Sequence, residues 1–339
     1  MPRCGSQCYL CDLPIRFDTY IGCSHACRYC FAQKKQDITN IRKGEGVDGL
    51  KRFIAGERAA ETRWCDWDIP LHWGGMSDPL QPIEKEIGLS YKCLKVFEQT
   101  QYPFIISTKG ALAGEEKYIE ILEKCNCVVQ ISAVCGKYDK IEKGCPSYAE
   151  RVEIMRKLSG RVKRVICRIQ PYMHEVYDDV FENLKILSDA GVYGVIIEGM
   201  KYAKKKKGLV RVGGDYCYPY KTIREDFEKL KEEGHKNGLK VYAGENRIRE
   251  LGDSLTCCGI DGLEGFVPNR FNLNHLLNGD EIIPTEKQKE GGTGSCFKTL
   301  CMEAGASQRI SKNSFANSMI TYYRYHRKTV DEVFGKGRK

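Results

Sequence analysis

The sequence predicts an α/β protein with a parallel β-sheet. Short apolar runs alternate with longer amphipathic stretches over about the first 250 residues, and the apolar runs are rich in β-branched side chains, as buried parallel strands are. Of the 339 residues, 42% are hydrophobic and 29% are charged, so the chain can bury a sizeable core and is not globally disordered. This length accommodates one large α/β barrel or two ordinary domains.

The expected strands and helices follow one another in a regular order. We expect strands at 16–21, 70–75, 103–108, 127–134, 163–170 and 193–198, with a seventh at 239–243. The intervening helices are expected at 83–99, 115–124, 148–158, 178–190 and 221–237. This alternation predicts right-handed crossovers between parallel strands, and active sites in such folds gather at the carboxyl ends of the strands.

Composition also indicates a compartment. The chain has no run of 18 apolar residues, so neither a transmembrane helix nor a membrane partner is expected, and its first residues lack a charged-then-apolar signal pattern. We therefore expect a cytoplasmic protein. Its 18 cysteines then predict reduced thiols, some of which bind a metal or a cluster. Scattered ones such as Cys65 and Cys93 are interpreted as small buried hydrophobes.

Three cysteines follow the first expected strand with the spacing Cys-x3-Cys-x2-Cys: Cys23, Cys27 and Cys30. Three thiolates on one short loop can bind three irons of a 4Fe–4S cluster and leave the fourth iron without a protein ligand. An open metal position is typical of a reactive site. Zinc is the alternative, with His25 as its fourth ligand. The position after the first strand, and Tyr29 before the last cysteine, favour the cluster.

The motif resembles the signature of the radical S-adenosylmethionine superfamily. Two further segments, GMSDPLQPIE at 75–84 and ISTKG at 106–110, are similar to those of the spore photoproduct lyase-related branch, although Leu80 stands where an aromatic residue is usual. The resemblance covers about residues 14–200. It implies a partial (β/α)6 TIM-like barrel with parallel strands over 14–250, preceded by a cysteine-containing segment at 1–13 and followed by a cysteine-containing C-terminal extension at 251–339.

The same resemblance implies a cofactor and a reaction. S-adenosylmethionine chelates the open iron of the 4Fe–4S cluster, an electron cleaves it, and the resulting 5′-deoxyadenosyl radical abstracts hydrogen from the substrate. The electron comes from an external donor such as flavodoxin or ferredoxin. The resemblance places the methionine amino group against the backbone of Gly74 and Gly75, where glycine permits close approach. A simple strand-to-loop turn is the alternative. Ser77 and Asp78 follow directly and are expected at the same cofactor, as is Tyr29.

More candidate cofactor contacts end the later strands. Ser107 and Lys109 end the third strand, and Ser132 lies near the end of the fourth. Arg168 lies within the apolar fifth strand, where an unpaired charge is costly, and is expected to bind the cofactor carboxylate. A surface arginine facing outward is the alternative. Glu198 ends the sixth strand and is expected at the ribose or the substrate, or in an ion pair with Arg168 or Lys109.

A second group of cysteines predicts an auxiliary metal site. Three lie near the N-terminus and repeat the motif spacing, and four lie late in the chain: Cys4, Cys8, Cys11, Cys257, Cys258, Cys296 and Cys301. A further Fe–S cluster or a zinc ion would tie the N-terminal segment to the extension, and spacing does not decide which cysteines belong together. Free buried thiols or a redox dithiol are the alternatives.

Charge suggests the substrate. The net charge is +9, and the excess of Lys and Arg is concentrated in the run 201–207 and in 302–339, where aromatic residues are interleaved. Such segments suit a nucleic acid, whose modification or repair is the leading hypothesis. Radical modification of a peptide or small metabolite is the second. A non-catalytic Fe–S or zinc protein that binds nucleic acid is the third.

Overall fold

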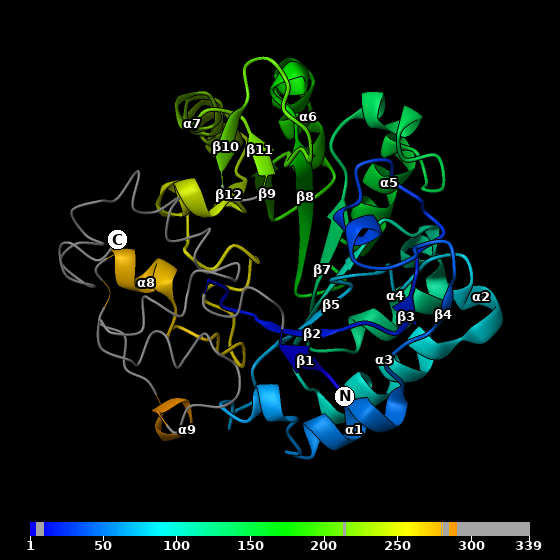
Figure 1. Cartoon of the computed structure of the whole chain (residues 1–339). Coiled ribbons are helices and arrows are strands. Elements are labelled where there is room, and N and C mark those ends of the chain that lie inside the picture. Colours follow the sequence, from blue (N-terminus) through cyan, green and yellow to red (C-terminus); the bar gives the residue numbers. More distant parts are fainter. Residues whose placement is uncertain (5–9, 213–214, 279, 281–284, 290–339) are drawn as a thin grey trace.

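An eight-stranded sheet forms the centre of the computed structural model, which describes residues 1–4, 10–212, 215–278, 280 and 285–289 (Figure 1). The strand order is β1-β2-β5-β6-β7-β8-β9-β12. All neighbouring strands are parallel except β1 and β2, so the predicted parallel sheet is confirmed. The bounds are β1 Arg3–Cys4, β2 Ile15–Phe17, β5 Leu71–Trp73, β6 Phe104–Thr108, β7 Cys127–Ser132, β8 Arg164–Tyr172, β9 Gly194–Gly199 and β12 Lys240–Ala243.

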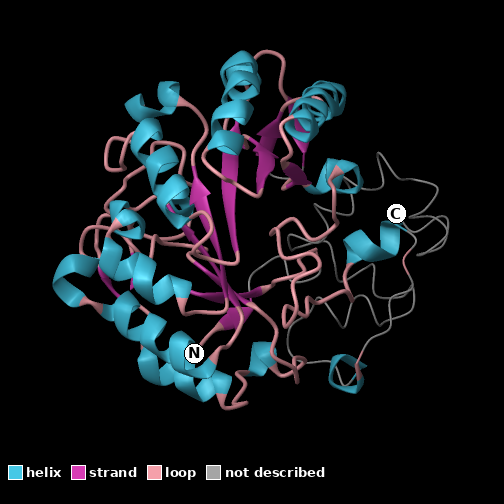
Figure 2. Cartoon of the chain, turned by 180° about the vertical axis from the view of Figure 1, so that it is seen from behind, coloured by secondary structure: helices cyan, strands magenta, loops and turns pink. Residues whose placement is uncertain are grey.

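Helices cover one face of this sheet, and residues 252–278, which follow η6, lie on the other side (Figure 2). The α-helices are α1 Val47–Ile54, α2 Glu84–Ile87, α3 Leu89–Thr100, α4 Glu116–Glu123, α5 Tyr148–Leu158, α6 Tyr177–Asp189, α7 Tyr220–Lys236, α8 Leu273–Asn278 and α9 Glu286–Lys289. The 3-10 helices are η1 Phe31–Lys34, η2 Ala60–Thr62, η3 Ala111–Gly114, η4 Gly136–Lys140, η5 His174–Val176 and η6 Asn246–Leu251. No described helix has the length and apolar character needed to cross a bilayer.

Some local features differ from the sequence-based expectations. The strand expected at 16–21 is divided into Ile15–Phe17 and Tyr20–Ile21, which belong to different sheets. The helix expected at 83–99 is divided into α2 and α3 by Gly88, whose φ of 62° is left-handed and ends the first segment. Two short antiparallel pairs were not expected. They are β3 Tyr20–Ile21 with β4 Arg42–Lys43, and β10 Val210–Val212 with β11 Asp215–Cys217.

Alternating side chains divide the core in two. Residues such as Ile106, Val129 and Cys167 pack toward the helices in the larger cluster. The other face carries a smaller cluster of strand residues and of segments from both ends of the described chain: Leu13, Ile105, Val128, Ile166, Ile196, Tyr242, Cys258, Ile260 and Phe266. Residues 257–266 therefore fill the inner side of the sheet near the amino ends of its strands, and leave the carboxyl ends for polar residues.

Candidate iron–sulfur and cofactor site

The predicted cysteine motif lies on the loop between β3 and η1, on the chain segment that follows the first parallel strand. The Cys23 N–H donates to the Ile38 carbonyl over 2.8 Å. Gly22 enters the loop with φ of 83°, and a Cβ there would lie 2.7 Å from the Asn40 carbonyl oxygen. Only glycine fits this conformation and this approach without strain. The backbone thus fixes where the loop begins.

His25, inside the loop, is engaged at both ring nitrogens. Its Nδ1 lies 2.8 Å from the Gly144 carbonyl oxygen, and its Nε2 lies 3.1 Å from the Asp78 carboxylate. Burial alone would lower the pKa of His25, but Asp78 and Gly144 raise this pKa overall. Both ring nitrogens thus face oxygen atoms of the protein, so neither is free for a metal. The arrangement therefore argues against the zinc alternative, in which His25 is the fourth ligand.

Asp78 binds protein donors with both of its oxygens. Oδ1 accepts from the Leu80 N–H at 2.8 Å and from the Thr108 hydroxyl at 2.6 Å, and Oδ2 accepts from the Lys109 N–H at 2.6 Å. His25 completes the set. The hydrogen bonds thus show Asp78 as the group that joins the cysteine loop to the ends of β5 and β6. Its predicted contact with the cofactor remains a prediction.

Tyr29 connects the loop to β7 through buried charges. Its hydroxyl donates to Glu142, whose other oxygen lies 2.6 Å from Arg151 Nη2. Arg151 is fully buried and donates from Nη1 to the Ser132 carbonyl over 2.8 Å. Burial raises the pKa of Glu142 to about 7, although Arg151 acts in the opposite direction. Tyr29 and Ser132, two predicted cofactor contacts, therefore belong to one chain of contacts.

The structure adds Cys145, which the sequence analysis did not identify. Its Sγ lies 3.7 Å from the Cys27 Sγ. The hydrogen bond from Cys145 lowers the pKa of Cys27 to about 6, and Lys109 acts in the same direction. The Lys109 ammonium lies 5.8 Å from the centre of the Tyr29 ring. A cation beside the loop offsets the negative charge that thiolate ligands bring.

Gly74 and Gly75 occupy the tight turn after β5. Gly74 has φ of 91°, and a Cβ there would lie 2.3 Å from the Ser107 carbonyl oxygen. A Cβ on Gly75 would lie 2.9 Å from Cδ of Arg16. Ser77 is buried and donates its hydroxyl to the Tyr20 carbonyl over 2.6 Å. These contacts explain the two glycines by close packing within the protein. The predicted cofactor contact also needs backbone without a side chain, which both glycines provide.

A row of polar side chains crosses the inner face of the sheet. Ser107 bonds His72 at 3.1 Å and Gln130 at 2.8 Å, and the same Gln130 oxygen accepts from Arg168 at 2.8 Å. The row continues through Gln170, Glu198 and Lys201. Arg168 thus points inward, and the alternative of an outward surface arginine is wrong. Glu198 pairs with Lys201 at 2.6 Å rather than with Arg168 or Lys109.

The auxiliary cysteines are described only in part. Cys8, Cys296 and Cys301 lie outside the described residues. The Cys257 and Cys258 sulfurs are 4.0 Å apart. Burial raises the pKa of Cys11 to about 12, and the nearby Cys257 raises it further. Cys4 on β1 is also close enough for Cys11 to raise its pKa. The structure therefore brings the N-terminal and late cysteines into one neighbourhood.

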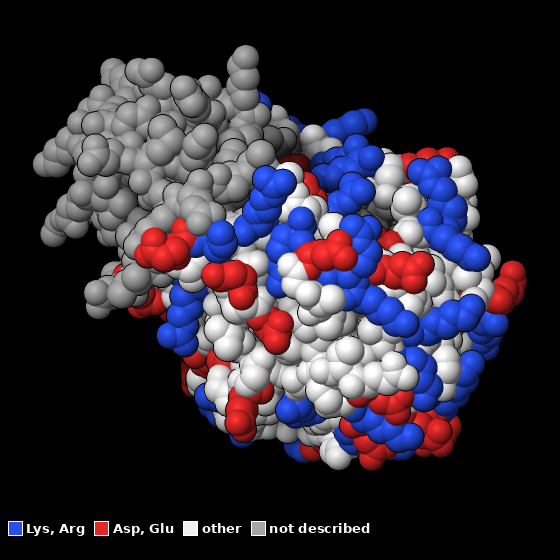
Figure 3. All heavy atoms as spheres, turned by 90° about the horizontal axis from the view of Figure 1, so that it is seen from below, with Lys and Arg blue, Asp and Glu red and all other residues white. Residues whose placement is uncertain are grey.

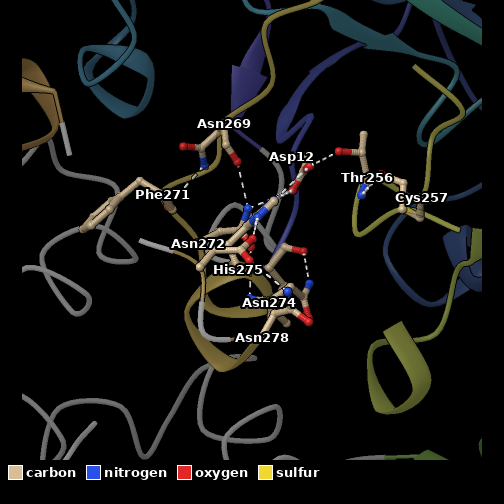
Figure 4. Close-up of polar contacts among 12 residues, drawn as sticks. Asp12, Thr256, Cys257, Asn269, Phe271, Asn272, Asn274, His275 and Asn278 are labelled. Carbon is tan, nitrogen blue, oxygen red and sulfur yellow. Dashed lines mark hydrogen bonds and ion pairs between the residues drawn. The ribbon is translucent and has the colours of Figure 1, made fainter. Parts of the chain in front are cut away.

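A buried polar clamp joins the two chain segments that carry these thiols (Figure 4). Asp12 accepts from Thr256, from Asn272 at 2.8 Å and from His275 at 3.2 Å. His275 also lies 2.6 Å from Asp280. Because Asp12 follows Cys11 and Thr256 precedes Cys257, the clamp holds these two cysteines near each other.

Neither cysteine group is gathered around a single point. In the described part of the chain, no three Cys, His, Asp or Glu side chains have the geometry of a bound metal ion. A zinc ion draws four ligands to one atom, whereas a 4Fe–4S cluster binds each thiolate at a separate iron.

Comparison with solved structures identifies the architecture. Spore photoproduct lyase complexed with dinucleoside spore photoproduct superposes with a TM-score of 0.53 and 18% identity, over 68% of this chain and 77% of the lyase. A lyase variant with bound AdoMet gives 0.52 and 18%, over 68% and 76%. The chain has the fold of spore photoproduct lyase. Streptococcus suis SuiB bound to its precursor peptide SuiA gives 0.50 and 12%, over 69% of this chain and 49% of SuiB. At these identities the likeness establishes a shared fold and not a shared activity.

Sequence comparison gives less information than structural comparison. No protein-family model matches the chain. The uncharacterized proteins Rv2578c of Mycobacterium tuberculosis and Mb2609c of Mycobacterium bovis are 24% identical over 210 residues, which is 58% of this chain and 62% of theirs. The chain thus matches less than two thirds of the length of these relatives.

Proposed function

We propose that the chain is a radical S-adenosylmethionine enzyme whose 4Fe–4S cluster is held by Cys23, Cys27 and Cys30. The observation that carries this proposal is a loop with three thiols, on this fold, whose histidine is already bound by Asp78 and Gly144. When bound, the cluster and S-adenosylmethionine supply a 5′-deoxyadenosyl radical that abstracts hydrogen from a substrate. A flavodoxin or ferredoxin is the proposed electron donor.

The chain's own residues then bind and orient the cofactor. Gly74 and Gly75 have no side chains, so the amino group of the cofactor can approach their backbone closely. Arg168 has a fork of donors and faces inward, which suits a carboxylate. Ser107, Ser132, Lys109 and Glu198 lie at the carboxyl ends of neighbouring strands and are proposed to line the same site.

The test is formation of 5′-deoxyadenosine by anaerobically reconstituted protein under reduction. We expect product from the wild type and none when Cys23, Cys27 and Cys30 are replaced together by Ala. Cys217→Ala is the control, because Cys217 is a buried thiol on β11 that belongs to neither cysteine group. Cofactor cleavage by the triple variant at the wild-type rate would disprove the proposed ligands.

A nucleic acid is the proposed substrate class. Lys204–Lys207 are exposed and lie between the carboxyl end of β9 and the hairpin β10–β11. The Lys206 ammonium lies 4.2 Å from the centre of the Tyr202 ring, so charge and an aromatic face occur together, as in grooves that stack bases. By contrast, Lys and Arg alternate with Asp and Glu on the face in Figure 3. The basic segment 302–339 lies outside the described residues.

Salt dependence tests this substrate class. Binding to an oligonucleotide is expected to weaken with salt by a log–log slope of about −0.7 to −0.9 per phosphate contact. Replacing Lys204–Lys207 by Ala, or removing the chain from Lys328 onward, should flatten the slope. The control replaces four exposed lysines of other elements, Lys51, Lys92, Lys124 and Lys157. Equal slopes in both lysine variants would favour a peptide or small metabolite. Binding without any cofactor cleavage would favour the non-catalytic alternative.

We also propose that Cys11, Cys257 and Cys258 contribute to an auxiliary Fe–S cluster or zinc site. The clamp around Asp12 supports this, since it fixes both cysteine-bearing segments at once. Metal analysis of the variant lacking Cys23, Cys27 and Cys30 should show residual iron or zinc. Replacing the three auxiliary cysteines as well should remove it. No residual metal in the first variant would leave them as structural thiols or a redox pair.

A further inference from the structure

Cys145 is a free thiol that meets the cysteine loop from another part of the chain. Its Sγ lies 3.7 Å from that of Cys27, although the two residues are 118 positions apart in sequence. Cys27 is buried, whereas Cys145 is half-buried and thus more open to a small oxidant. Two sulfurs at this distance are in van der Waals contact.

The surrounding backbone makes this a built juxtaposition. Residues 141–144 run along residues 24–29, and a contact joins the two segments at nearly every step. These contacts are the Arg28 N–H to the Ile141 carbonyl at 3.0 Å, the Tyr29 hydroxyl to Glu142, and His25 Nδ1 to the Gly144 carbonyl at 2.8 Å. A Cβ on Gly144 would lie 2.5 Å from the Ser24 carbonyl oxygen, so a side chain there would push the segments apart.

We propose that Cys27 and Cys145 form a reversible disulfide when the cluster-free chain meets hydrogen peroxide. Peroxide converts one thiol to a sulfenic acid and releases one water. The second thiol then attacks that sulfur, forms the S–S bond and releases a second water. The two thiols lose two electrons and two protons in total, and one peroxide is reduced to two waters.

The geometry makes this pair favourable for the reaction. Disulfide sulfurs lie about 2.05 Å apart, so the two sulfurs must approach by about 1.7 Å. With Cys27 as a cluster ligand, which rests on the proposed function, the disulfide would block iron loading at that position. It would also keep Cys27 from passing to the irreversible sulfinic acid. Thiol reduction then restores the ligand.

The test uses metal-free full-length chain. The reduced protein is treated with two equivalents of hydrogen peroxide, the amount that oxidation of one thiol to sulfinic acid consumes. Free thiols are then alkylated, and peptides are mapped by mass spectrometry without reduction. We expect a peptide pair that joins Cys27 to Cys145 as the main cross-linked product. We also expect iron uptake to fall by more than half and to return after dithiothreitol. In Cys145→Ala, Cys27 should instead appear as sulfinic acid, and dithiothreitol should not restore the uptake. Cys217→Ala is expected to behave as the wild type.

Two results would overturn the proposal. One is a wild-type map in which Cys27 is joined to Cys23 or Cys30, or to no residue. The other is equal recovery of iron uptake in Cys145→Ala and the wild type. The cross-link is measured without the cluster and without cofactor cleavage, so its failure is distinct from failure of the proposed activity. The wild-type map also decides the matter if Cys145→Ala does not fold.

Discussion

Asp78→Asn tests how the cysteine loop is held in place. The substitution keeps the size of the side chain but replaces one acceptor oxygen by an NH2 group. Asp78 is surrounded by donors on both oxygens, so the amide must face donors wherever it points. If it replaces Oδ2, both the Lys109 N–H and the His25 ring lose their acceptor.

The expected cost follows from those lost contacts. A buried N–H without an acceptor costs about 1–3 kcal/mol, and a buried ion pair that loses one partner costs about 3–5 kcal/mol. Both figures describe the same oxygen, so we expect about 3–5 kcal/mol in total rather than their sum. The free energy of unfolding of a protein is typically about 5–15 kcal/mol, so the variant should fold but with much reduced stability.

The contribution of Asp78 to stability depends on pH. Burial alone would raise the pKa of Asp78, but His25 and the hydrogen-bond donors lower it overall below 3.8. The contribution of Asp78 is therefore present above about pH 3.8 and is lost as pH falls through the depressed pKa. At pH 7 the full difference between wild type and variant should be seen.

Guanidinium unfolding of the reduced, metal-free chain, followed by circular dichroism, measures this difference. Asp37→Asn is the matched control, because Asp37 is exposed on the segment after the motif and its hydrogen bonds come from the nearby residues Thr39 and Asn40. We expect its unfolding midpoint to remain that of the wild type. Equal midpoints for Asp78→Asn and Asp37→Asn would refute the role of Asp78 in holding the loop.

Three other variants test separate features. Gly74→Ala should destabilise the chain by about 1–3 kcal/mol because of its left-handed backbone, and by more if the new Cβ cannot move away from the Ser107 carbonyl. Gly46→Ala is the control. Gly46 has φ of −106° and open space around it, so this change should alter the unfolding midpoint little. Burial alone would lower the pKa of His275, but Asp12 and Asp280 raise it overall. The stability that His275 contributes is therefore complete below about pH 6.5 and is lost as pH rises through the raised pKa. The difference in unfolding midpoint between the wild type and His275→Gln should shrink from pH 5.5 to 8.5. Arg168→Leu should raise the S-adenosylmethionine concentration for half-maximal 5′-deoxyadenosine formation by about tenfold to a hundredfold, and an unchanged value would exclude a cofactor contact.

Much of the fold was predictable because it follows from local patterns. The strands β6 and β7 are mainly apolar and are buried along their whole length, as such runs predict for strands covered on both faces of a sheet. The cysteine loop was predictable for the same reason, since its ligands lie within eight residues. The division at Gly88 was harder to see, because the helical pattern of apolar residues continues across it.

The parts that were missed depend on contacts between distant residues. Nothing in the spacing relates Cys145 to Cys27, and their proximity arises from how the segment before α5 returns along the cysteine loop. The sequence also does not show that His25, a possible zinc ligand by its position, lies beside Asp78, which is 53 residues away along the chain. The ion pair expected for Glu198 was with Arg168 or Lys109, whereas its partner is Lys201, three residues further along the chain.

The arrangement of the inner cluster has a consequence for the order of events during synthesis. The contacts described above for His25, Tyr29 and Asp78 are made by residues up to Arg151, whereas the inner face of the sheet is filled only when residues 257–266 and the clamp at His275 have been added. At a translation rate of about 5–20 residues per second, the interval between these stages is roughly 6–25 s. During that time the nascent chain would carry an assembled cysteine loop above an unfilled sheet face. Under the proposed function, iron delivered in this window would meet Cys23, Cys27 and Cys30 before the inner face of the sheet is filled.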